Sequence, residues 1–228
     1  MAEAHFSPEL FKFLKDLAAN NERDWFQANK ALYEKVVVDP ALRFISDVGP
    51  GLREISPHVL ALPKKVGGSL FRIYRDVRFS NDKSPYKTHV GIQFRHKQAK
   101  DAHAPGFYLH LEPGQVFVAA GVWHPPGTAL KALRQAMIDD PAAWEAVRDD
   151  PTLQRRFAFA GESLKTAPRG VDSDHPLIED LKRNDLMVVA DLDEKAATSP
   201  KFLDRFLGLC RDASPLNTWI CQALDVPF

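Results

Sequence analysis

The chain has 228 residues, and its 30 Lys and Arg balance its 30 Asp and Glu, so the formal net charge is zero. A hydrophobic fraction of 45% and a charged fraction of 26% are typical of a globular protein and exclude a disordered chain. The zero net charge also excludes a general electrostatic attraction of the whole chain to nucleic acid or to membranes.

The first sixty residues have the pattern of a helical layer. Ser7-Pro8-Glu9 is typical of a helix start, with an N-cap serine, a proline at the first helical position and an acid in the first turn. A second helix is predicted from about Glu22, and Asp39-Pro40 predicts a third that runs through Leu52. Apolar residues recur at helical spacing in all three, so this layer is expected to cover a core.

Residues 70–95 contain two alternating runs separated by a turn. One parity of the first run is apolar except for an arginine: Phe71, Ile73, Arg75, Val77 and Phe79. The other parity is polar: Arg72, Tyr74, Asp76 and Arg78. Turn-forming residues follow at 80–85, and then Val90, Ile92 and Phe94 alternate again. We therefore predict an antiparallel hairpin with one buried face, in which Arg75 forms a structural ion pair.

The rest of the chain completes an α+β pattern. A second hairpin is predicted over 106–123, with its turn at Pro113-Gly114, and a further strand over 186–190. Later helix starts are predicted at Asp140-Pro141, Asp150-Pro151, Ser199-Pro200 and Ser214-Pro215. We expect a single domain over residues 1–228, in which an antiparallel sheet of about four to five strands (70–123 plus 186–190) packs with N- and C-terminal helices.

Features of the whole chain indicate a cytoplasmic protein. The amino terminus lacks the pattern of a signal peptide, and no apolar segment approaches the ~20 residues that span a bilayer, so we expect no membrane partner. Cys210 and Cys221 fit neither a CxxC redox pair nor a structural zinc site, and we expect both to be reduced core thiols. The oligomeric state stays open.

Positive charge gathers around the first hairpin. Between Lys64 and Lys100 there are ten Lys and Arg but two acids, a local charge of +8. Such segregation predicts an anion-facing surface, although a solvated strand edge guarded by lysines is the alternative. If the hairpin forms, several side chains share its polar face or rim. The candidate substrate-binding residues are Arg72, Arg78, Lys83, Tyr86, Lys87 and His89.

A second candidate is the sequence His110-Leu111-Glu112. In a strand, residues i and i+2 face the same side, so the imidazole and the carboxylate stand together. With His89 or Asp76 they could bind a divalent metal, or they could act as a general acid–base pair. A hydrogen-bonded structural pair is the third possibility. We take Asp76, His110 and Glu112 as candidate catalytic residues, and we assign no metal ligand and name no cofactor.

The stretch FRIYRDVRFSNDKSPYKTH, residues 71–89, resembles the signature of the DUF2461 family of domains of unknown function. The resemblance continues through residues 11–14, 24–26 and 28–30, through 108–114, and into the carboxy-terminal helices. It covers nearly the whole chain. The resemblance implies one compact α+β domain of cytoplasmic type, but it implies no particular activity, cofactor or catalytic residue.

Two functional hypotheses follow. The first is a binding or catalytic site for an anionic small molecule bearing phosphate or carboxylate, on the polar face of the sheet. The second is a non-enzymatic module whose basic sheet face meets nucleic acid or an acidic protein, with Tyr74 and Tyr108 available to stack bases. A concave pocket would favour the first hypothesis, and a flat basic face with both tyrosines outward would favour the second.

Overall fold

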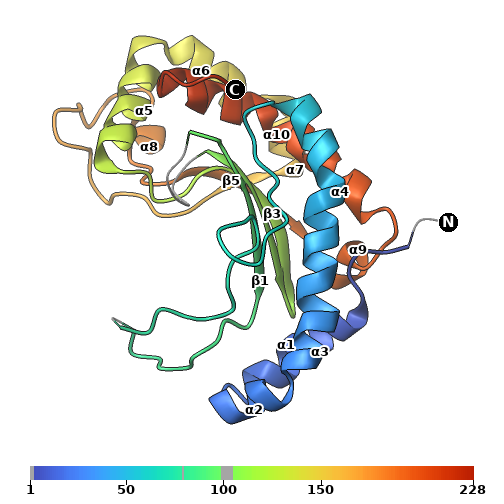
Figure 1. Cartoon of the computed structure of the whole chain (residues 1–228). Coiled ribbons are helices and arrows are strands. Elements are labelled where there is room, and N and C mark those ends of the chain that lie inside the picture. Colours follow the sequence, from blue (N-terminus) through green and yellow to red (C-terminus); the bar gives the residue numbers. More distant parts are fainter. Residues whose placement is uncertain (1–2, 79, 99–104) are drawn as a thin grey trace.

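The computed structural model describes residues 3–78, 80–98 and 105–228, and within them it has the predicted α+β fold (Figure 1). Five strands form one sheet in the order β1-β2-β3-β5-β4, and every neighbouring pair is antiparallel. The strands are β1 (Val90–Arg95), β2 (Gly106–Glu112), β3 (Gln115–Val122), β4 (Ala158–Ala160) and β5 (Leu186–Leu192). The short edge strand β4 was not predicted, because three residues carry too little alternation to show a strand.

The N-terminal helical layer is as predicted, although its last three members follow one another without a break. Its members are α1 (Pro8–Ala19), α2 (Arg23–Ala28), α3 (Lys30–Tyr33), the π-helix η1 (Glu34–Val38) and α4 (Asp39–Ile55). Ser7 has the extended backbone of an N-cap, and Pro8 opens α1. The predicted start at Asp39-Pro40 continues a helical run, because η1 leads directly into α4.

The later helices show where local start signals hold and where they fail. They are α5 (Gly127–Asp139), α6 (Pro141–Arg148), α7 (Pro151–Arg156), α8 (Ile178–Leu181), α9 (Glu194–Ala197) and α10 (Phe202–Ala223). Asp140 and Asp150 cap α6 and α7 as predicted. The predicted start at Ser214-Pro215 is wrong, because α10 runs through it. Pro215 has no N–H for the carbonyl of Arg211, but the Ser214 hydroxyl donates to that oxygen at 2.8 Å.

The core lies between the helices and one face of the sheet. Helices α4 and α10, from opposite ends of the chain, pack against each other, and α10 also lies on β3 (Figure 1). Phe44 of α4 meets Phe94 of β1 and Phe206 of α10 with ring centroids 6.5 and 5.3 Å away, and all three are fully buried. None of the helices in the described ranges is both long and apolar enough to span a membrane.

Residues 70–78 do not form the predicted strand. Two isolated bridges, Leu70 to Ile92 and Tyr74 to Tyr86, keep the predicted antiparallel sense, but no continuous ladder joins them. The segment leaves the edge of the sheet and returns to β1 as a projecting arm, which comprises residues 71–78 and 80–89 (Figure 1). Burial still alternates along it, with Ile73 buried while Arg72 and Tyr74 are exposed. Phe79, on the predicted apolar parity, lies outside the described residues.

Candidate functional site

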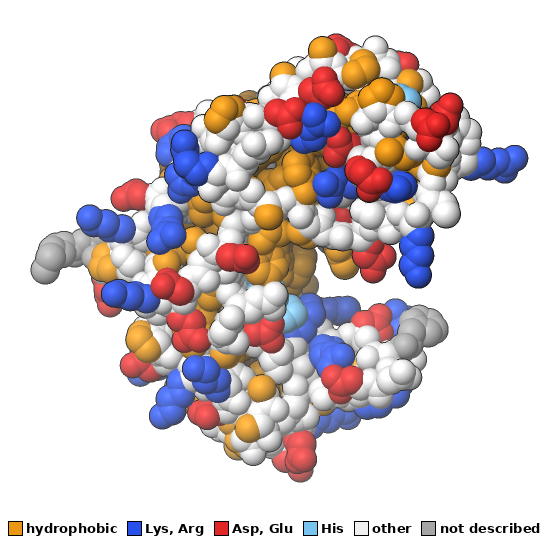
Figure 2. All heavy atoms as spheres, turned by 180° about the vertical axis from the view of Figure 1, so that it is seen from behind, with side chains coloured by type: hydrophobic (Ala, Val, Ile, Leu, Met, Phe, Trp, Pro, Cys, Tyr) orange, Lys and Arg blue, Asp and Glu red, His pale blue; other side chains and the backbone are white. Residues whose placement is uncertain are grey.

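The sheet face turned away from α4 and α10 forms the floor of a cleft of about 410 Å³. Seen from behind, a hollow with hydrophobic side chains along it opens between two lobes of the molecule (Figure 2). Its aromatic lining residues are Phe71, Phe107, Tyr108, Phe117 and Trp123. Its polar lining residues are Lys87, His89, Gln93 and His110. The cleft is therefore largely apolar, with polar groups contributed by the arm, β1 and β2.

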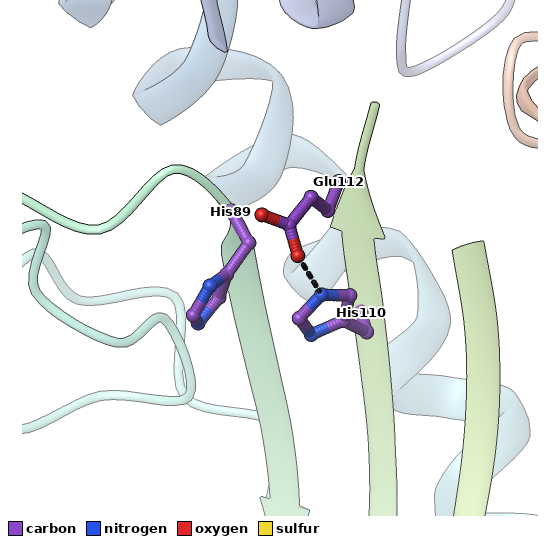
Figure 3. Close-up of side chains that lie close together, drawn as sticks. All are labelled: His89, His110 and Glu112. Carbon is purple, nitrogen blue, oxygen red and sulfur yellow. Dashed lines mark hydrogen bonds and ion pairs between the residues drawn. The ribbon is translucent and has the colours of Figure 1, made fainter. Parts of the chain in front are cut away.

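Strand pairing places the His110–Glu112 pair on this face. In the register, His110 lies between Gly91 of β1 and Phe117 of β3. The His110 ring stacks on Phe117 with centroids 4.6 Å apart and an interplanar angle of 7°. His89, where the arm enters β1, brings its ring to 4.5 Å from that of His110. The two imidazoles and the Glu112 carboxylate converge, with one ligand atom from each within 4.8 Å of the others (Figure 3).

Hydrogen bonds connect this cluster to its surroundings. Nε2 of His110 lies 3.1 Å from Oε2 of Glu112, and Nδ1 of His110 lies 3.1 Å from the hydroxyl of Tyr108. The Thr88 hydroxyl donates to the other carboxylate oxygen, Oε1 of Glu112, at 2.8 Å. Both ring nitrogens of His110 and both oxygens of Glu112 therefore have partners, which fixes their orientation.

Burial sets the charge of the cluster. Burial lowers the pKa of His89 to about 4, and the nearby His110 adds to that effect. Burial also lowers the pKa of His110, although Glu112 opposes the shift. For Glu112 burial acts to raise the pKa, but hydrogen bonds from Thr88 and His110 outweigh it and hold the pKa below its ordinary value. At neutral pH the cluster thus consists of two neutral imidazoles and one carboxylate.

Gly91 leaves the space that the hydrogen bond between Tyr108 and His110 requires. Gly91 lies beside Tyr108 and Phe71, and a Cβ at this position would come within 2.7 Å of the Tyr108 hydroxyl and 3.1 Å of the Phe71 ring. Without a side chain there, Tyr108 can hydrogen-bond to His110. The sequence reasoning overlooked Gly91, Thr88 and Phe117. A glycine inside an alternating strand is a signal of close approach, and it could have pointed to the first of them.

Lys87 carries positive charge into the cleft. Its ammonium group donates to the backbone oxygen of Arg72 at 3.1 Å and lies 5.3 Å from the centroid of the Phe71 ring. The side chain is half-buried, and this burial, together with the charge of Arg72, lowers its pKa. No carboxylate of the described residues forms a salt bridge with Lys87. The cleft therefore contains a cation without an acidic partner in this part of the chain.

The other predicted charged residues lie exposed on the arm and do not line the cleft: Arg72, Asp76, Arg78 and Lys83. A hydrogen bond from Arg78 lowers the pKa of Asp76 to about 2, which makes this carboxylate a weak base. Lys83 donates to the backbone oxygen of Val77 at 2.9 Å. Arg75 forms an ion pair with Asp82, as predicted. The structure therefore brings together His89, His110 and Glu112 and leaves Asp76 apart from them.

Tyr86 does not lie at the rim of a polar face, and the prediction that placed it there is wrong. Its ring stacks on Phe26 with centroids 4.1 Å apart, and only 2% of the residue is exposed. The Asn21 side chain holds its backbone from both sides, accepting from Tyr86 N and donating to Tyr86 O, each at 3.0 Å. An aromatic ring gains more from burial in the helical layer than from a solvated rim.

Comparison with known families agrees with the resemblance seen in the sequence. The family model described as a conserved hypothetical protein (DUF2461) matches residues 9–219. Comparisons with curated proteins and with solved structures gave no match. The match spans most of the chain, including all five strands and the residues that converge in the cleft. The protein therefore belongs to the DUF2461 family.

Proposed function

We propose that the cleft binds a small molecule with a flat apolar body and one anionic group. The observation that carries this proposal is the combination of an aromatic lining with the half-buried ammonium of Lys87. An apolar ligand body gains about 25 cal/mol for each Å² that it removes from water, and Phe71, Phe117 and Trp123 offer such a surface. A carboxylate or phosphate on that body would supply the counter-charge that Lys87 lacks among the described residues.

The arm would contribute to binding at a distance. Arg72 is exposed beside Lys87, and its charge reaches that ammonium group. It would attract an anion toward the cleft without contacting the buried part of the ligand. The predicted proton exchange by His110 and Glu112 belongs to the same proposal, because His110 lines the cleft and Glu112 is hydrogen-bonded to it. Asp76 lies outside it.

The alternative of a basic face for nucleic acid or an acidic protein has less support. Tyr74 is 50% exposed, as a stacking residue must be, but Tyr108 lines the cleft and its hydroxyl meets His110. Arg78 and Arg75 also have acidic partners, which reduces the charge they offer to a phosphate backbone. If this alternative holds, single-stranded DNA is retained at low salt and the double variant Arg72→Ala/Arg78→Ala loses that retention.

A matched set of probes tests the small-molecule proposal on chelator-treated protein. 2-Naphthoate has an aromatic body and a charge, 2-naphthamide has the body alone, and acetate has the charge alone. Calorimetric titration is expected to show the tightest binding for naphthoate. Lys87→Met is expected to weaken naphthoate binding roughly 10- to 100-fold and to leave naphthamide unchanged, since a hydrogen bond to a charged group contributes on the order of 1.5–3 kcal/mol.

Lys83→Met is the matched control. Lys83 is a lysine of the same arm that also donates to a backbone carbonyl, but it is exposed and does not line the cleft. Its removal is expected to change naphthoate binding by less than twofold. Equal binding of naphthoate and naphthamide, or equal losses in the two lysine variants, would overturn the role of Lys87 as the anion partner.

A further inference from the structure

We propose that His89, His110 and Glu112 form a binding site for a divalent first-row transition metal ion, with Zn²⁺ as the representative, open toward the cleft. The proposal goes beyond ligand binding and does not depend on it, because Lys87 takes no part and none of the three metal ligands is an aromatic residue of the apolar lining. Two imidazoles and one carboxylate are a ligand set that proteins use for zinc and for non-haem iron.

The spacing of the donor atoms is close to what one ion requires. Nitrogen and oxygen ligands lie about 2.0–2.2 Å from Zn²⁺, so neighbouring donors around it are roughly 3–3.5 Å apart. Nε2 of His110 and Oε2 of Glu112 are already 3.1 Å apart. The whole set of three donor atoms falls within 4.8 Å. A small rotation of side chains would therefore close the set around an ion without moving the strands.

Each of two ligands already has an outer partner of the kind that supports metal sites. The Tyr108 hydroxyl oxygen can accept a hydrogen bond from the N–H at Nδ1 of His110, and in that tautomer the lone pair of Nε2 is free to bind a metal. The Thr88 hydroxyl holds Oε1 of Glu112 and leaves Oε2 on the side of His110. A hydroxyl group can reverse its donor and acceptor roles, so the same contacts serve the metal-free and metal-bound forms.

A purely structural hydrogen-bond network explains His110 and Glu112 but does not explain His89. No hydrogen bond to the ring nitrogens of His89 is found among the residues that the structure describes, although the ring lies 4.5 Å from that of His110 and lines the cleft. The His89 ring is therefore available to a ligand that enters the cleft.

Three protein ligands leave at least one coordination position free. In proteins this arrangement is typical of catalytic rather than structural zinc, because the free position accepts water or a substrate group. His89 and His110 both line the cleft, so the free position would face a bound molecule. The chemical class that fits is a ligand with a carboxylate, phosphate or carbonyl oxygen, polarised by the ion.

Metal titration of chelator-stripped protein tests this inference. Calorimetry with Zn²⁺ is expected to show one ion bound per chain, and Co²⁺ is expected to give the visible absorption bands of a four- or five-coordinate site. His89→Gln and Glu112→Gln should each weaken Zn²⁺ binding at least 100-fold. Tyr108→Phe, which leaves the ligands in place, should weaken it about 10- to 100-fold.

The control is His5→Gln, since His5 forms a histidine–carboxylate pair with Asp47 at 2.8 Å elsewhere on the molecule. It should leave Zn²⁺ affinity unchanged. Circular dichroism of each metal-free variant establishes that it is folded, and if one ligand variant unfolds, the other carries the test. Absence of stoichiometric Zn²⁺ binding, or binding unaffected by both ligand variants, overturns the site. Naphthoate binding by metal-free protein tests the cleft separately, so the two proposals can fail independently.

Discussion

At the scale of single residues, the candidate site depends on a position that has no side chain. Gly91 of β1 leaves room for the ring of Tyr108, whose hydroxyl meets Nδ1 of His110 at 3.1 Å. Phe71 of the arm approaches the same space, with its ring centroid 6.0 Å from that of Tyr108. The orientation of His110, and through it the geometry of the cluster, therefore depends on an absent Cβ.

We predict that Gly91→Ala destabilises the protein and disturbs His110. The added Cβ meets the Tyr108 hydroxyl at 2.7 Å, and such overpacking costs about 1–3 kcal/mol. The gain from replacing a strand glycine is only about 0.5–1 kcal/mol, so the free energy of unfolding should fall by roughly 1 kcal/mol. Urea denaturation measures the fall, and NMR of the His110 ring should show the altered hydrogen bond.

The double variant Gly91→Ala/Tyr108→Phe tests whether the loss of stability comes from the contact between the new Cβ and the Tyr108 hydroxyl or from a general destabilisation of β1. Tyr108→Phe removes the atom nearest to the new Cβ. The double variant should therefore be more stable than the sum of the two single changes. Strict additivity would mean that the Tyr108 hydroxyl is not what the new methyl group displaces.

At the scale of elements, the arm is fixed to the helical layer rather than to the sheet. At its start, Phe71 N donates to the backbone oxygen of Gly91 in β1 at 2.9 Å. Farther along, Tyr86 is buried against Phe26 of α2, and Asn21 holds the Tyr86 backbone with two hydrogen bonds. Lys87 and His89 follow directly in the chain. The turn between α1 and α2 therefore sets where these two side chains enter the cleft.

We predict that Asn21→Ala loosens the arm. Both backbone groups of Tyr86 would lose their partner, and a buried group left without one costs about 1–3 kcal/mol. Amide hydrogen exchange at Tyr86 should accelerate at least tenfold, and naphthoate binding should weaken because Lys87 is no longer held. Asn20→Ala is the matched control, since Asn20 bonds only locally, to the Asp16 carbonyl. Equal exchange in both variants would contradict this anchoring role.

At the scale of the whole molecule, the two ends of the chain share one core. Helix α4 precedes the sheet and α10 follows it, yet Phe44 of α4 contacts Phe202 and Phe206 of α10, with centroids 5.6 and 5.3 Å away. If the N-terminal and C-terminal segments separated, these aromatic rings would be exposed to water. The expected single domain over residues 1–228 rests on this packing.

We therefore predict a single cooperative unfolding transition. Calorimetric and van't Hoff enthalpies should agree, and far-UV circular dichroism and tryptophan fluorescence should give the same midpoint. Phe44→Ala should lower the free energy of unfolding by about 3–5 kcal/mol and shift both signals together. Leu32→Ala, at a side chain 45% exposed, should change it by less than about 0.5 kcal/mol. Two separate transitions would indicate two domains.

Much of the fold could be predicted from the sequence because its signals are local. Alternation with a period of two placed β1, β2 and β3, and a short apolar run containing Val188 and Val189 placed β5. Aspartate followed by proline placed the starts of α6 and α7. Local signals failed where other contacts satisfied the backbone. Pro215 did not break α10, because the Ser214 hydroxyl takes over the carbonyl of Arg211. Residues 70–78 alternate but lack a continuous partner, so they remain an arm.

The sequence by itself determined that His110 and Glu112 stand on one side of a strand, because the strand period fixes this without any tertiary contact. It also determined the positive charge of residues 64–100. Only the tertiary structure decided that His89 joins the pair while Asp76 does not, that Tyr86 is buried, and that helices cover one face of the sheet and leave the other as a cleft. These outcomes depend on packing between segments far apart in the chain, and the free energy of burying their apolar surfaces exceeds any local preference.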